Sequence, residues 1–213
     1  KSSSSKRKAI NYIICNDLPT LLWLVNQGCI EMHPWLSKID QLDKPEAVIF
    51  DLDPNEEASF KDVVDVALLV REVLKKLGLK SYPKTSGATG LHIYIPIFQD
   101  YSFERVRVFA EKIAKLIVQA FPNKSTIERQ VKQRGSKVYI DYMQNVQGKT
   151  IASVFSVRPV PEASVSMPVT WASLERGSVN PKDFTLLNTP TLLSNGHPNF
   201  SEVLANKQKL VDV

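Results

Sequence analysis

Two long segments of the chain carry apolar residues at helical spacing. Between Ser59 and Gly78, and again between Ser102 and Phe121, apolar side chains recur every three or four positions, which predicts two amphipathic helices. Ser59 and Asp62 also have the spacing of a capping box at the start of the first helix. We expect both helices to be scaffold that packs behind a sheet.

Several shorter segments alternate between apolar and polar residues, as strands do. A short helix over residues 18–27, capped by Asp17 and ended by Gly28, is expected between the first two predicted strands. The tail from residue 160 to residue 213 predicts short elements, and residues 1–10 predict a basic arm or loop. We therefore expect one α+β domain over residues 1–213, a mainly antiparallel sheet flanked by helices. The predicted strands are residues 11–16, 29–33, 48–54, 79–84, 91–97 and 137–143.

Composition is that of an ordinary globular protein. The 213 residues are 43% hydrophobic, yet no apolar run approaches the roughly 18 residues that span a bilayer and no signal peptide is recognisable. We expect a cytoplasmic protein with no membrane partner. Cys15 and Cys29 fit neither a disulfide framework nor zinc spacing, so we expect buried thiols. The net charge of +5 favours a polyanionic partner such as nucleic acid.

The segment 48–54 is the strongest candidate for chemistry. In a strand Asp51 and Asp53 point to the face opposite Val48, Phe50 and Leu52, with Cα atoms roughly 6.5 Å apart. Two carboxylates at this spacing can share a hard cation or clamp a pair of cations. Two other interpretations stay open from these residues alone: a turn at Asp-x-Asp-Pro that only ends a strand, and the nucleophile of a haloacid dehalogenase.

A glycine loop between two predicted strands is the second candidate. The segment 85–90 contains Ser86, Gly87 and Gly90, and His92 follows on the face opposite the apolar residues. Glycines, a hydroxyl and backbone N–H groups can wrap a phosphate. A plain hairpin turn is the equally open alternative. The basic run 128–137 that comes later is either a solvated face or a place for a nucleic-acid backbone.

Further polar residues follow strands. Asp141 is a third acid on a predicted strand, and Gln144 comes directly after it. His33 ends another predicted strand, where it is either a packing histidine or a functional one.

The order of these motifs resembles the polymerase domain of bacterial DNA ligase D, a member of the archaeo-eukaryotic primase superfamily, from about Asn11 to about Phe200. The family section that precedes this region, with an aromatic residue that stacks on the nucleotide and basic residues, is expected to be missing. Ala88-Thr89 and Val154-Phe155 depart from the family pattern. The motifs are Asp51-x-Asp53, Ser86-Gly87-x-x-Gly90-x-His92, Asp141-Tyr142-x-Gln144-Asn145, Gly148-Lys149-Thr150 and Ser156-x-Arg158-Pro159.

The resemblance implies a primase-type sheet, two divalent cations (Mn²⁺ or Mg²⁺) and a role for each matching position. Asp51, Asp53 and Asp141 match the catalytic metal carboxylates. His33 matches a histidine near the sugar. The other nucleotide-binding positions implied are Ser86, Gly87, His92, Gln144 and Arg158, with Lys84 and Lys149 as basic positions.

The activity implied is primer extension and gap filling with NTPs or dNTPs in double-strand-break repair by non-homologous end joining. DNA, Ku and a DNA ligase module are the expected partners, and the nucleoid is the expected place. Two alternatives stay open: a nucleic-acid or nucleotide binding module without polymerase activity, and a replicative primase.

Overall fold

The computed structural model describes residues 11–198 and 200–212, so the basic arm expected over residues 1–10 lies outside the described part. The chain divides into two compact units, with the boundary between Ile30 and Glu31. Each unit is described separately below.

The first unit contains one helix, α1, over Leu18–Asn26. Asp17 caps it by accepting a hydrogen bond from the Thr20 backbone N–H (2.8 Å), and Gly28 follows it with a φ of +81°, both as predicted. The strand expected over residues 11–16 is wrong, because these exposed residues form no ladder with any described strand. The expectation of buried thiols is also wrong: Cys15 is exposed and Cys29 is half-buried.

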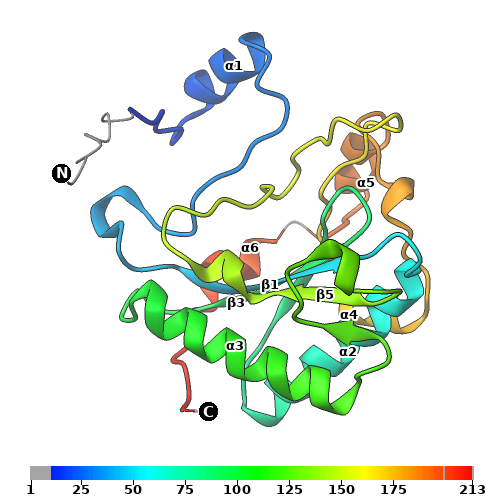
Figure 1. Cartoon of the computed structure of the whole chain (residues 1–213). Helices are drawn as coiled ribbons and strands as arrows, with labels where there is room; N and C mark the ends of the chain where they lie inside the picture. Colours follow the sequence, from blue (N-terminus) through cyan, green and yellow to red (C-terminus); the bar gives the residue numbers. More distant parts are fainter. Residues whose placement is uncertain (1–10, 199, 213) are drawn as a thin grey trace, which may run out of the picture. The chain divides into compact units, whose positions relative to one another are not determined.

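The second unit is built on a sheet, which in the described part of the chain has five strands in the order β2-β3-β1-β5-β4. All neighbours are antiparallel except β4 and β5, so the predicted mainly antiparallel sheet is confirmed (Figure 1). The strand β1 lies at the centre, and its partners on either side come from segments far along the chain. The strands are β1 Ala47–Pro54, β2 Tyr82–Thr85, β3 Leu91–Pro96, β4 Ser125–Thr126 and β5 Val138–Asp141.

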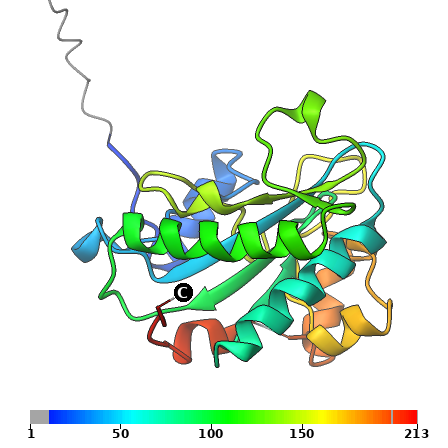
Figure 2. The ribbon, with the colours of Figure 1, turned by 60° about the horizontal axis from the view of Figure 1, so that its bottom comes forward.

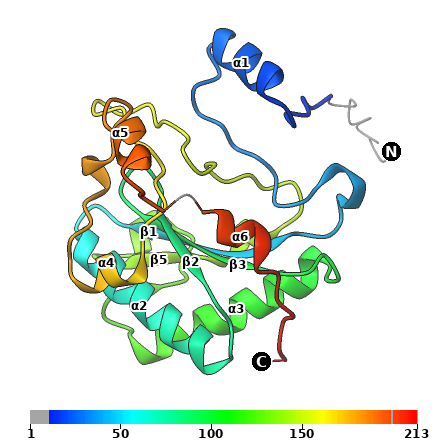
Figure 3. The same cartoon turned by 180° about the vertical axis from the view of Figure 1, so that it is seen from behind.

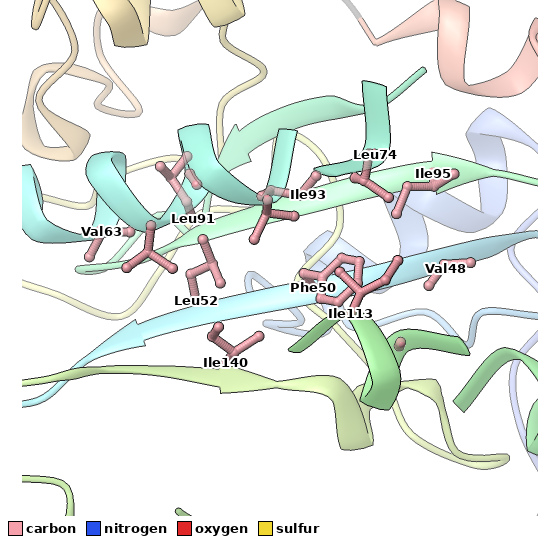
Figure 4. Close-up of a cluster of buried hydrophobic side chains, with 14 of the residues drawn as sticks. Val48, Phe50, Leu52, Val63, Leu74, Leu91, Ile93, Ile95, Ile113 and Ile140 are labelled. Atoms are coloured by element: carbon pink, nitrogen blue, oxygen red, sulfur yellow. The ribbon is translucent and has the colours of Figure 1, made fainter. Parts of the chain in front are cut away.

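Two amphipathic helices cover one face of this sheet, as their spacing predicts (Figure 2). They are α2, Phe60–Lys76, and α3, Phe103–Ala120. The Ser59 capping box begins α2. Figure 4 shows the core between these layers, where apolar side chains of β1, β3 and β5 meet Val63 and Leu74 of α2 and Ile113 of α3. Burial of this face leaves the opposite face of the sheet for polar side chains.

The described part of the tail contains short helices and isolated β-bridges, in keeping with the short elements expected there (Figure 3). A strand over residues 29–33 is not formed. Instead, the Met32 carbonyl accepts from the Ser153 N–H (2.9 Å) and the Met32 N–H donates to the Ser156 hydroxyl (2.9 Å). The segment around residues 153–156 is irregular, so the alternating residues 29–33 do not pair with it in a β-ladder. The short helices are α4 Trp171–Glu175, α5 Thr189–Ser194 and α6 Ser201–Ala205.

No helix in the described residues is both long and apolar enough to cross a bilayer.

Asn145 completes the central strand where β5 ends. Its buried side chain accepts from the Ile49 N–H (2.8 Å) and donates to the Ile49 carbonyl (2.7 Å) and to the Tyr142 carbonyl (2.9 Å). One amide thus replaces a missing ladder partner and closes the 3₁₀ turn Tyr142–Asn145 against β1.

Asn145→Ala is expected to lower the free energy of unfolding by about 2–4 kcal/mol, because it leaves the buried N–H and C=O of Ile49 without partners. Urea denaturation followed by circular dichroism measures the change. The exposed Asn123→Ala is the control, expected within about 0.5 kcal/mol of the unsubstituted protein. A loss below about 1 kcal/mol for Asn145→Ala would contradict this role.

Candidate active site

A row of polar residues crosses the sheet on the face that the long helices leave open. Lys84 on β2 is the register partner of His92 on β3, His92 of Asp51 on β1, and Asp51 of Asp141 on β5. Residues paired in register share a face, so four strands contribute to one site. The predicted alternation of β1 is confirmed, with Val48, Phe50 and Leu52 in the core.

Asp51 and Asp53 have strongly raised pKa values. Burial raises the pKa of Asp51 to about 6, opposed by the Gln144 amide, which donates to it at 3.2 Å, and by the charge of Lys84. Burial and then the charges of Asp51 and Asp141 raise the pKa of Asp53 to about 7. The site therefore favours protons or bound cations at neutral pH.

Asp141 has one oxygen committed to the protein. Its Oδ1 accepts from the Met143 N–H (2.9 Å) and the Tyr139 hydroxyl (3.2 Å), which fixes the carboxylate at the start of the 3₁₀ turn. Burial, followed by the charge of Asp51, still raises its pKa.

The donor set fits hard divalent cations, which prefer carboxylate oxygens. Asp51 Oδ1 is buried and accepts no hydrogen bond from any described residue, although His92 Nε2 lies 3.3 Å away. A buried carboxylate oxygen without a donor is the kind of atom a cation satisfies. Among described residues, no three acidic, His or Cys side chains are grouped around one ion position.

Ser86 organises the glycine loop. Its hydroxyl accepts from the N–H groups of Ala88 (3.2 Å) and Gly90 (3.0 Å), so two donors that we expected to face a phosphate are already used inside the loop. The Ser86 hydroxyl proton remains as a donor. A Cβ on Gly90 would lie 2.2 Å from the Leu52 carbonyl oxygen, which explains why glycine is needed where the loop meets β1.

Gly87 brings the loop against Arg158. Its φ is +81°, and a Cβ there would lie 2.6 Å from Arg158 Cγ and 2.8 Å from the Ser166 nitrogen. Two predicted site residues far apart in sequence are therefore packed together. The charge of Arg158 lowers the pKa values of Asp51 and Asp53, opposing the effect of burial.

Lys84 is completely buried (0% exposed), so its ammonium group contacts other residues of the protein and not solvent. Its ammonium donates to the Ser166 hydroxyl, which donates to the Thr85 carbonyl. Burial lowers the pKa of Lys84 to about 7, and the charge of Asp51 opposes this effect. Burial, followed by the charges of Lys84 and Arg158, holds the pKa of His92 well below its ordinary value, so this ring is neutral.

The remaining predicted residues lie around this row. His33 contacts Glu31, which in turn contacts Arg158. Lys149 is exposed in the turn after the 3₁₀ helix, and its charge opposes the rise in the Asp141 pKa.

Comparison with known proteins identifies the family. The family model for the LigD primase-polymerase domain matches residues 1–199. This chain belongs to the LigD primase-polymerase domain family. Members of that family are metal-dependent nucleotidyltransferases of non-homologous end joining.

Two LigD relatives and one solved structure support this membership. The chain is 36% identical over 176 residues to the bifunctional non-homologous end joining protein LigD of Bacillus subtilis, covering 82% of this chain and 28% of that protein. It is 32% identical over 172 residues to the multifunctional LigD of Mycolicibacterium smegmatis, covering 80% and 23%. The chain thus spans about a quarter of the length of these relatives. The polymerase domain from Mycobacterium tuberculosis ligase D in complex with DNA matches with a TM-score of 0.79 and 27% identity, over 88% of this chain and 68% of that one.

Two residues of this LigD-family site, Ser166 and Glu31, were given no role by sequence reasoning, and Asn145 was named only as part of a motif. Asn145 and Ser166 act through buried hydrogen bonds, which no local pattern indicates. Glu31 lies two residues before His33, and that proximity was the only available signal.

Asp53→Asn is expected to stabilise the metal-free protein at pH 8. A carboxyl whose folded pKa is raised favours the protonated folded state, so its ionisation removes stability as the pH rises from about 4 to 7. We expect a gain on the order of 2 kcal/mol, or about 4–8 °C in Tm, at pH 8, shrinking toward pH 5.

Thermal melts in EDTA measure this gain, with Asp100→Asn, an exposed acid, as the matched control. In parallel melts without EDTA, added Mn²⁺ should stabilise the unsubstituted protein and not Asp53→Asn. Equal melting of Asp53→Asn and the unsubstituted protein at pH 8 would contradict the buried-charge assignment.

Proposed function

We propose that this chain extends primers and fills gaps in DNA with nucleoside triphosphates during double-strand-break repair by non-homologous end joining. The observation that carries the proposal is the register of the sheet, which puts the carboxylates of Asp51 and Asp141 opposite each other with Asp53 on the same face. Membership in the LigD primase-polymerase family supports it.

The three aspartates would hold the divalent cations. A pair of Mn²⁺ or Mg²⁺ ions, when bound, would activate a primer 3′-hydroxyl and neutralise the leaving pyrophosphate. Asp51 and Asp53, two residues apart on β1, would each supply carboxylate oxygens to the cations. Asp141, on the far side of Asp51 from His92, is assigned to the ion nearest the primer hydroxyl.

The triphosphate is assigned to the groups on the other side of Asp51. His92 is neutral and nearly buried, so it contributes an N–H donor instead of a positive charge. Arg158 contributes a charged fork, and the Ser86 hydroxyl adds a donor from the loop. Gln144, which already contacts Asp51 at 3.2 Å, is assigned to the incoming nucleotide.

DNA is the proposed polymer partner, in keeping with the DNA in the similar solved structure. Arg129 and Lys132 are exposed on the segment that leads into β5 and are suited to phosphates of the backbone. Arg134 is committed elsewhere, because its guanidinium lies 3.8 Å from the Tyr139 ring centroid. Ku, a ligase module and a place in the nucleoid complete the proposal.

Asp51→Ala and Asp53→Ala are each expected to abolish nucleotide addition, because each removes a carboxylate that holds cations. The assay mixes the chain with a primed gapped duplex, nucleotides and Mn²⁺, and detects primer extension on a gel. Asp100→Ala should extend normally. Extension by either site variant would remove the central assignment, and binding without extension by the unsubstituted chain would favour a binding module. Product formed with the primer omitted would favour a replicative primase.

His92→Ala is expected to raise the apparent KM for the nucleotide about tenfold, because a donor to the phosphates is lost. Initial extension rates over a nucleotide titration measure this, and circular dichroism checks that the variant is folded. An unchanged KM would count against the proposed triphosphate pocket.

A further inference from the structure

Two distant segments are held together beside the proposed nucleotide site. The hydrogen bonds of Met32 to residues 153 and 156 join the segment that follows Ile30 to the segment that leads into Arg158. The Ile151 N–H adds a longer bond to the Pro34 carbonyl (3.4 Å). These backbone contacts fix the backbone positions from which the side chains of Glu31 and His33, on either side of Met32, extend.

The side chain of Glu31 joins two of the proposed nucleotide contacts through a single atom. Its Oε1 lies 2.8 Å from Nε of Arg158 and 3.1 Å from Nε2 of His33. The side chains are 29%, 23% and 36% exposed respectively, so all three are within reach of a ligand. One carboxylate oxygen therefore sets the separation of the arginine and the histidine.

These contacts determine which atoms face a ligand. A carboxylate only accepts hydrogen bonds, so the His33 nitrogen beside it is the donor, and Nδ1 is the ring atom left to accept. An acceptor there suits a sugar hydroxyl. Nε of Arg158 lies against Glu31 Oε1 as an ion pair without hydrogen-bond geometry, and this contact fixes where the guanidinium lies while its two Nη groups can donate to a phosphate.

We propose that Glu31 is a positioning residue that couples recognition of the nucleotide sugar by His33 to recognition of the triphosphate by Arg158. The inference rests on the proposed function, because it takes the ligand to be a nucleoside triphosphate. It adds a residue, and a specificity role, that the metal carboxylates and the phosphate loop do not supply.

A simpler electrostatic expectation has the opposite sign. A carboxylate close to a bound triphosphate repels it and competes with it for Arg158, so removal of Glu31 would tighten anion binding. Under the positioning role its removal weakens binding, because Arg158 and His33 lose their fixed orientation. The direction of the change therefore separates the two.

The test measures equilibrium binding of GTP, dGTP and inorganic triphosphate to the full chain in Mn²⁺ without DNA. For Glu31→Ala we expect the Kd for GTP to rise about tenfold and that for inorganic triphosphate about threefold. The Kd ratio of dGTP to GTP should move toward one, since the His33 acceptor is no longer fixed. Glu31→Gln, whose amide oxygen still accepts, should restore most of the affinity.

Two further variants show whether the changes in Kd are specific to Glu31 and whether they depend on Arg158. Glu72→Ala removes an exposed acid from α2 and should change no Kd. In an Arg158→Ala background, Glu31→Ala should no longer affect inorganic triphosphate, because the two residues act as one unit. Thermal melts confirm that each variant is folded.

Tighter triphosphate binding by Glu31→Ala, or effects that add to those of Arg158→Ala, would overturn the coupling role. If the unsubstituted chain binds nucleotide normally and Glu31→Ala leaves every Kd unchanged, only the positioning role of Glu31 is rejected. Absence of nucleotide binding and primer extension by the unsubstituted chain would instead reject the proposed function.

Discussion

The mutual repulsion of buried carboxylates is the constraint on which the rest of this structure depends. Asp51 and Asp141 face each other on adjacent strands, and like charges directly opposite in a sheet are destabilising. Burial is the main cause of the raised pKa values of all three acids, and the charge of Asp51 adds to it at Asp53 and Asp141. A stable core must therefore hold these groups in place; the larger cluster lies on the other face of the sheet, under α2 and α3, and a smaller cluster with Ile49 and Ile151 adds to it (Figures 2 and 4).

Local contacts hold the acids in place where the hydrogen bonds of the sheet alone would not. The β5 ladder runs beside only part of β1, and the Asn145 amide continues it with hydrogen bonds of 2.8 and 2.7 Å. Gly90 lets the loop approach the Leu52 carbonyl on the other side. Both edges of β1 are thus occupied by backbone or by a group that imitates it, so Asp51 and Asp53 have little freedom to move apart.

The sequence predicted the structure correctly where the spacing of apolar residues was sufficient to define an element and its buried face. Alternation in β1 placed Asp51 and Asp53 on the face opposite Phe50, and the 3.6-residue period of α2 and α3 gave the scaffold. It failed at residues 11–16 and 29–33, because alternation describes a strand's faces but supplies no partner for its backbone. The roles of Asn145 and Glu31 were not predicted for a related reason: they consist of contacts with residues about a hundred positions away.

The order of residues across the sheet also orients the proposed reaction. The row runs from the buried ammonium of Lys84 through neutral His92 to Asp51 and Asp141, so positive charge lies on the β2 side and negative charge on the β5 side. Arg158 packs against Gly87 and strengthens the positive end. Under the proposed function, a triphosphate would be attracted to that end, and the primer hydroxyl, which must lose a proton, would be left to the acidic end. Strand order and Arg158 together would therefore set the direction in which the nucleotide and the primer meet.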